Sequence, residues 1–146
     1  MILPILIYKN ENSKLRKINK NIKKYKNINS IINNMFDTMY YNNGIGLAAP
    51  QIGKNIKLFI IGINNIKETY INPKIIKYSK KNIISKESCL SLPRLKIKII
   101  RKKIIKVKYY NINWKKKYKI LNNFLSIIFQ HEYDHINGKL IIDYLK

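Results

Sequence analysis

Residues 131–135 read H-E-Y-D-H and carry the sharpest chemical signal in the chain. His131 and His135 are four positions apart, so on a helix both imidazoles point to one face, with Cβ atoms about 5–6 Å apart. Two imidazoles at this spacing can bind one divalent metal ion. Glu132 lies about 100° around the helix. There it can take a proton from a metal-bound water without being a ligand, which is the chemistry of a metal-dependent hydrolase.

A catalytic metal site of this kind needs a third protein ligand and an open position. The chain has only two histidines, so the third ligand must be a thiol or a carboxylate. Cys89 is the single cysteine, and a loop before Pro93 could aim it at the helix. Asp143 follows His135 by eight residues and is a second candidate. Asp134 is expected on the other side of the helix. The residue types alone leave this choice open.

Periodicity predicts the elements that must position these residues. Apolar residues at helical spacing predict a helix over residues 27–41, namely Ile28, Ile31, Ile32, Met35 and Met39. Runs rich in Ile, Tyr and Val predict strands at 57–63, 69–78, 82–90, 95–100, 104–110 and 114–121. A second helix is predicted over 124–136, with Asn122 or Asn123 as its cap and Gly138 as its stop. Residues 9–24 are polar and predict a loop or an exposed helical turn. This order indicates an α+β fold.

Composition limits the class of protein. The 146 residues suit one domain, 1–146. One cysteine excludes a disulfide-stapled secreted module and predicts a reducing, cytoplasmic location. No apolar run approaches the roughly 20 residues of a membrane-spanning helix, so no membrane partner is expected.

The charge is extreme, with 30 Lys and Arg against 7 Asp and Glu, a net +23. Only 3 of the 30 basic residues are Arg, and Ile, Lys and Asn dominate the chain. This bias indicates an A/T-rich coding sequence in which Lys has displaced Arg. The charge can therefore reflect either a ribosome-facing surface or compositional drift, and we expect no specific nucleic-acid partner.

Three segments resemble the signature motifs of the peptide deformylase family. They are residues 44–51 (GIGLAAPQ), 87–91 (ESCLS) and 130–138 (QHEYDHING), in the order and at the approximate spacing of that family. Smaller likenesses occur at 35–40, 71–73 and 138–145, so the resemblance covers nearly the whole chain. It implies antiparallel β-sheets packed around a central C-terminal helix that carries the H-E-x-x-H motif, with an N-terminal helix. It also implies removal of formate from the N-formyl-methionine of newly made polypeptides.

The resemblance assigns roles to individual residues. It implies one divalent metal, Fe(II) before Zn, Ni or Co, held by Cys89, His131 and His135. Glu132 would be the general base and acid for attack of metal-bound water on the formyl carbon. The Gln51 amide and the Leu90 backbone N–H would stabilise the oxyanion. The resemblance also pairs Glu87 with Arg101 in an ion pair. The residues expected to bind the peptide are Gly44, Ile45, Gly46, Phe124, Ile127 and Ile128.

Two other functions compete with this interpretation. A metallopeptidase of the H-E-x-x-H type would have to use Asp143 as its downstream ligand. A basic RNA- or ribosome-binding protein would show aromatic and lysine side chains on one face, for which the candidates are Tyr109, Tyr110, Trp114, Tyr118 and Lys115 to Lys117. Because three enzyme motifs are present together, we expect nascent N-formylated polypeptides as the main partner and the ribosome surface as a secondary one.

Overall fold

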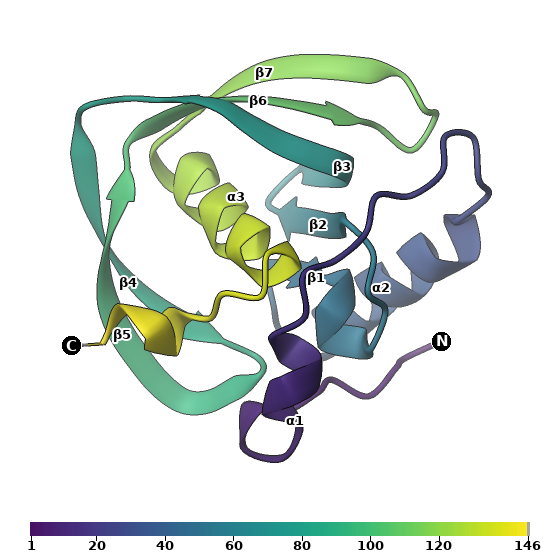
Figure 1. Ribbon diagram of the computed structural model, residues 1–146, viewed down its shortest axis with the longest axis horizontal. Coiled ribbons are helices and arrows are strands. Elements are labelled where there is room, and N and C mark those ends of the chain that lie inside the picture. Colours follow the sequence, from purple (N-terminus) through teal and green to yellow (C-terminus); the bar gives the residue numbers. More distant parts are fainter. Residues whose placement is uncertain (146) are drawn as a thin grey trace.

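A computed structural model describes residues 1–145 and has the expected α+β fold (Figure 1). Its helices are α1 (Tyr8–Leu15), α2 (Asn29–Tyr41) and α3 (Asn123–Ile136), with 3-10 helices η1 (Ala49–Ile52) and η2 (Ile141–Tyr144). Its strands are β1 (Gly46–Ala48), β2 (Leu58–Ile63), β3 (Ile66–Tyr78), β4 (Asn82–Cys89), β5 (Leu92–Lys102), β6 (Ile104–Tyr110) and β7 (Lys116–Asn122).

The strands form two antiparallel sheets around α3. Five of them follow the order β1-β2-β3-β6-β7, and β4 pairs with β5 in a separate two-stranded ribbon. Figure 1 shows α3 in the middle, with β3, β6 and β7 on one side and the β4–β5 ribbon on another. Aromatic rings join the helix to the larger sheet, because Phe129 of α3 contacts Phe59 and Tyr70 with ring centroids 4.9 and 5.1 Å away. The expected central helix is confirmed.

Helix α2 covers the β1–β2 end of the molecule with the predicted apolar stripe. Ile32, Met35 and Met39 are buried and belong to one core cluster with Leu47 and Leu58. The 3-4 spacing of these residues therefore predicted the correct face. Burial of this face anchors β1, which borders the candidate site.

The polar segment 9–24 is more structured than predicted. Its first half belongs to α1, and Leu15 at the end of that helix is fully buried. Leu15 packs with Leu92, Leu140 and Ile141 in a third core cluster. Leu15 is the only aliphatic residue of α1, so the helix itself shows no apolar periodicity and the sequence did not reveal this contact.

The boundaries of α3 are partly as predicted. Gly138 follows the helix at a φ of +74°, so the glycine stop is confirmed. Asn122 occupies the N-cap position, but its side chain makes no capping hydrogen bond. Asn123 is in the left-handed region at a φ of +51°. The predicted side-chain cap is therefore wrong.

Trp114 also departs from its predicted strand. It lies in the β6–β7 turn at a φ of +59°, and β7 begins only at Lys116. None of the helices in the described residues is long and apolar enough to cross a membrane.

Candidate metal and active site

Two elements bring the potential metal ligands together. Cys89 ends β4, and His131 and His135 lie on successive turns of α3. One donor atom from each of the three residues falls within a cluster whose atoms are all within 4.8 Å of one another. Cys89 Sγ is 3.3 Å from His135 Nε2. Cys89 and His135 are buried, and His131 is nearly so.

Glu87 orients the first histidine. The Nδ1–H group of His131 donates a hydrogen bond of 2.9 Å to Glu87 Oε1, which leaves Nε2 available to a metal. Burial raises the pKa of the Glu87 carboxyl, but hydrogen bonds from Arg101 and His131 outweigh burial and lower it to about 2. Glu87 is therefore an anion that fixes both the tautomer and the direction of the His131 ring.

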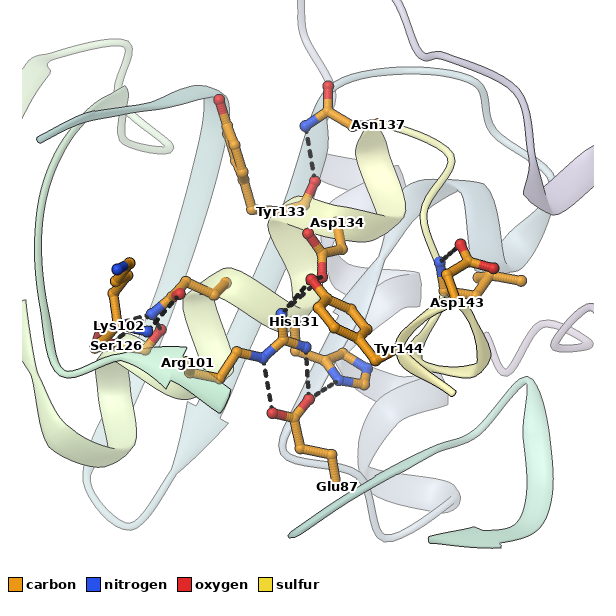
Figure 2. Close-up of polar contacts among 12 residues, drawn as sticks. Glu87, Arg101, Lys102, Ser126, His131, Tyr133, Asp134, Asn137, Asp143 and Tyr144 are labelled. Carbon is orange, nitrogen blue, oxygen red and sulfur yellow. Dashed lines mark hydrogen bonds and ion pairs between the residues drawn. The ribbon is translucent and has the colours of Figure 1, made fainter. Parts of the chain in front are cut away.

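Arg101 holds Glu87 and connects it to the C-terminal segment (Figure 2). Its side chain is only 3% exposed, and its Nε and Nη2 groups donate to both Glu87 oxygens at 2.8 and 2.7 Å. Its Nη1 group donates to Asp134 Oδ2 at 2.7 Å and to Tyr144 Oη at 3.0 Å. The Tyr144 hydroxyl in turn donates to Asp134 at 2.7 Å. The expected Glu87–Arg101 ion pair is present, and Asp134 and Tyr144 extend it.

Glu132 points into the site with an unused oxygen. Its side chain is buried, and Oε1 has no hydrogen-bond partner among residues 1–145. Burial raises the pKa of Glu132 to about 7, so the carboxyl can both accept and return a proton near neutral pH. A Cβ atom at Gly46 would lie 2.6 Å from Glu132 Oε2. Glycine is therefore required there for the carboxyl to keep its place.

The side-chain amide of Gln51 is held with its NH₂ group towards the cysteine. Its Oε1 accepts a hydrogen bond of 3.0 Å from the Ala48 backbone N–H. Its Nε2 donates to Ser91 Oγ at 3.1 Å and lies 3.6 Å from Cys89 Sγ. Because the carbonyl side is occupied, the amide cannot flip, and a preorganised donor faces the site.

A cavity of about 640 Å³ opens in front of these groups. Every residue that the sequence placed in the site lines it except His135, which contacts Cys89 but is not part of the lining. Ile127 and Ile128 are buried, whereas Ile45 and Phe124 are about half exposed. The cavity thus has an apolar inner wall and an open outer end.

The donor set fits a divalent transition metal. One thiol and two imidazoles are ligands that Fe(II), Zn, Ni and Co all accept. Burial lowers the pKa of His135 well below its ordinary value, which keeps the ring neutral, as a metal ligand must be. The partnerless Glu132 oxygen lies in the same cavity, where a group at the metal could supply its hydrogen bond.

The structure excludes the other candidate for third ligand. Asp143 forms an ion pair with Arg16 and accepts a hydrogen bond from the Leu140 N–H. Because its carboxylate is used there, Asp143 is not among the clustered donors. The metallopeptidase hypothesis thereby loses its downstream ligand.

The predicted basic and aromatic RNA-binding face is also incomplete. Tyr109 is only 2% exposed and packs in the core with Tyr70, at 4.6 Å between ring centroids. Tyr118 is exposed on β7. Tyr118 pairs with Lys108, the neighbour of Tyr109 on β6, and successive residues of a strand point to opposite faces, so Tyr118 and Tyr109 cannot share a surface.

Sequence reasoning missed two members of the site. It assigned no function to Asp134 or Tyr144, although both contact Arg101. Asp134 is three residues after His131 on α3, and Tyr144 lies in a segment already noted for its likeness to the family. The likeness of that segment to the family was the available signal for Tyr144. Nothing in the segment indicated that Arg101 would be its partner.

Comparisons with known proteins agree with this geometry. The family model described as polypeptide deformylase matches residues 2–146. A peptide deformylase from Karelsulcia muelleri is 57% identical over 98% of this chain and 78% of its own length. The crystal structure of peptide deformylase from Thermotoga maritima matches with a TM-score of 0.94 at 36% identity, over 100% of this chain and 99% of that one. A peptide deformylase from Legionella pneumophila matches with a TM-score of 0.93 at 35% identity, over 100% and 87%. On these grounds the chain belongs to the polypeptide deformylase family.

Proposed function

We propose that this chain removes the formyl group from N-formyl-methionine at the N-terminus of newly made polypeptides and releases formate. The observation that carries the proposal is the cluster of the Cys89, His131 and His135 donors beside a cavity that Cys89, His131 and Glu132 line and that is apolar on its inner side. Family membership supports the same reaction.

Cys89, His131 and His135 would hold one divalent metal. We propose Fe(II) as the metal in the cell, with Zn, Ni or Co able to take its place. When bound, such a metal polarises the formyl oxygen and makes a water molecule acidic enough to lose a proton near neutral pH. The chain's own contribution is to orient the His131 ring through Glu87 and to keep the buried His135 ring neutral.

Glu132 would move the proton. With its pKa raised to about 7 by burial, the carboxylate accepts a proton from the attacking water and returns it to the departing amine nitrogen. Gly46 supports this role, because it leaves the space that the carboxyl group occupies.

Gln51 and Leu90 would stabilise the oxyanion. The Gln51 Nε2 group already faces Cys89, and the Leu90 backbone follows the cysteine directly. Donors held in place before the reaction stabilise developing charge without reorganising, and loss of one typically costs about 10²–10³ in rate.

The peptide would bind along the cavity as an added strand. Gly44 and Gly46 allow its backbone to come close, and a Cβ at Gly44 would lie only 3.0 Å from Leu90 Cδ1. The methionine side chain would enter between the apolar residues of the lining, which are Ile45, Phe124, Ile127 and Ile128.

Residues 1–146 would act as one catalytic domain. We place its action in the cytoplasm, where nascent N-formylated polypeptides emerge. The charge of +23 supports a weak, salt-sensitive attraction to the ribosome surface.

Formate release tests the proposal. Anaerobically loaded protein should release formate from formyl-Met-Ala-Ser and leave acetyl-Met-Ala-Ser intact, because an acetyl group adds a methyl where the formyl hydrogen lies. No formate from folded, metal-containing protein would contradict the proposal. Equal cleavage of unformylated peptides would favour a peptidase.

A further inference from the structure

Arginine is rare in this chain, and two of the three arginines hold carboxylates. Arg16 pairs with Asp143, and Arg101 pairs with Glu87 and Asp134. Arg94 differs, since it makes no ion pair and no side-chain hydrogen bond within residues 1–145. In a composition where Lys stands at nearly every basic position, an exposed arginine without a partner calls for a ligand that lysine serves less well.

Arg94 lies in the lining of the candidate active-site cavity. It is the third residue of β5 and follows Pro93, at a φ of +67°, shortly after the turn that joins β5 to Cys89 at the end of β4. Both Arg94 and Lys86 of β4 line the cavity and are exposed. They belong to its open side, because the buried apolar residues Ile127 and Ile128 form its inner wall.

These two cations have no counter-charge of their own. The carboxylates that line the cavity are Glu87 and Glu132. Glu87 is held by Arg101 and His131, and Glu132 is buried beside Gly46. Lys86 also faces Lys98 directly across the ribbon, and like charges in that position repel each other. An anion from outside the chain would relieve this repulsion.

A peptide carboxylate is the anion that the proposed substrate can bring to this site. The guanidinium group presents a planar fork that matches a carboxylate through two parallel hydrogen bonds, whereas lysine acts as a point charge. The peptide proposed to bind here passes the open side of the cavity after its methionine. We propose that Arg94, assisted by Lys86, binds the side chain of an Asp or Glu that follows the formyl-methionine, so that acidic N-termini are preferred substrates. This inference rests on the proposed deformylase function.

Matched peptides test this preference. The substrates are C-terminally amidated formyl-Met-Asp-Ala-Ser and formyl-Met-Ala-Asp-Ser, each beside its Asn counterpart, and the readout is the ratio of kcat/KM within a pair. An exposed ion pair predicts a ratio of about two to five in favour of Asp for one pair. The ratio should approach one at about 1 M salt, where the Debye length is about 3 Å.

Variants of Arg94 show whether this side chain causes the preference for Asp over Asn. Arg94→Gln should bring the ratio close to one, Arg94→Glu should invert it, and Arg94→Lys should keep part of it. Lys96→Gln is the matched control, because Lys96 is exposed on β5 and loses the same charge outside the cavity lining. It should keep the wild-type ratio. Circular dichroism would establish that each variant is folded.

Three results would overturn the inference. They are a wild-type ratio of one for both pairs, a ratio that survives Arg94→Gln, and a ratio lost equally in Lys96→Gln, which would show a general effect of net charge. If no peptide released formate, the proposed function would fail by itself. Equilibrium binding of the same peptides would then test the subsite, with the same ratios expected between dissociation constants.

Discussion

Two regions of the molecule place their charged side chains in opposite ways. One is the β4–β5 ribbon together with α3, and the other is the outer face of β6 and β7. The ribbon and α3 carry three of the seven carboxylates, Glu87, Glu132 and Asp134, all buried or partly buried. The outer face of β6–β7 includes Lys106, Lys108, Lys116, Tyr118 and Ile120, all wholly or partly exposed, and it carries no carboxylate. The inner side of β6, in contrast, is apolar and packs in the core with Phe129.

The difference teaches where residue identity matters in this chain. At the ribbon, Arg101 is fixed by three partners, and replacing it leaves buried anions without a counter-charge. On the outer face a lysine only has to remain solvated. Lysine enrichment is therefore tolerated on the outer face, whereas the paired groups of the site resist replacement. Substitutions in the two regions should differ accordingly.

The largest effect is expected from Glu132→Gln. Removal of the proposed proton-transfer group should lower formate release by about 10²–10⁴ while the three proposed metal ligands remain. Turnover is to be measured on samples of known metal content, with Glu11→Gln as a control far from the site. A variant that retains its metal and the full rate would show that Glu132 is not the base.

Arg101→Met should cause the largest loss of stability. It leaves the buried Glu87 carboxylate and the partly buried Asp134 carboxylate without a positive partner. Such a loss typically costs about 3–5 kcal/mol in the free energy of unfolding. Urea denaturation of metal-free protein measures the loss. The double variant with Glu87→Met should recover part of it, because the uncompensated anion is removed as well. A loss below about 1 kcal/mol would mean that the pair is not desolvated as described.

Tyr144→Phe should have an intermediate effect. The ring contact with Lys139 Nζ, at 4.1 Å from the centroid, would remain. The variant would lose the hydroxyl that donates to Asp134. A hydrogen bond to a charged group is worth about 1.5–3 kcal/mol. Tyr118→Phe on the outer face is the matched control and should stay within about 0.5 kcal/mol. Equal denaturation midpoints for Tyr144→Phe and Tyr118→Phe would contradict the expected difference between the site and the outer face.

The Arg16–Asp143 pair predicts a small dependence of stability on pH. Burial raises the pKa of Asp143, but hydrogen bonds from Arg16 and Leu140 outweigh it, so the net pKa is lowered. The folded pKa is thus below the unfolded value of about 3.9. The stabilisation is present above that value and is lost as the pH falls through the folded pKa.

Asp143→Asn isolates this contribution. The stability difference between wild type and variant should be below about 1 kcal/mol at neutral pH, because the pair is partly exposed. It should shrink further as the pH falls below about 4. Thermal unfolding across a pH series measures it. A difference that stays constant with pH would argue against the ion pair as its source.

The smallest effect is expected on the outer face. Lys106→Gln with Lys108→Gln should change the free energy of unfolding by no more than about 0.5 kcal/mol. Any change at low salt should be stabilising, since self-repulsion of a +23 chain is reduced. A loss above about 2 kcal/mol would place these lysines in structural contacts that the outer face does not show.

Local patterns predicted the parts of the fold that depend on periodicity. The α2 stripe and the α3 motif follow from spacings of three or four residues, and the alternating strands follow from a spacing of two. Strand β1 was not predicted, because its three residues lie in a glycine-rich segment and are held by pairing with β2. The burial of Leu15 was not predicted either, because it depends on partners that are distant in the sequence.

In the candidate site, too, some residues are visible in a local motif and others depend on contacts between distant parts of the sequence. The two histidines and Glu132 are visible in a single five-residue motif. Cys89 could be chosen over Asp143 only through the resemblance of whole segments, and its proximity to His135 joins residues 46 positions apart. The contacts of Arg101 with Asp134 and Tyr144 span 33 and 43 positions. Such pairs are set by the packing of α3 against the ribbon, which no local pattern encodes.

Cobalt titration joined to formate measurement tests the central claim most directly. Metal-free protein would receive Co(II) anaerobically, and thiolate-to-cobalt absorption and formate release from formyl-Met-Ala-Ser would be followed in the same samples. The account predicts that both rise together and saturate at one equivalent of metal, and that Cys89→Ala abolishes the absorption. Saturated thiolate-bound cobalt without any formate release would contradict it.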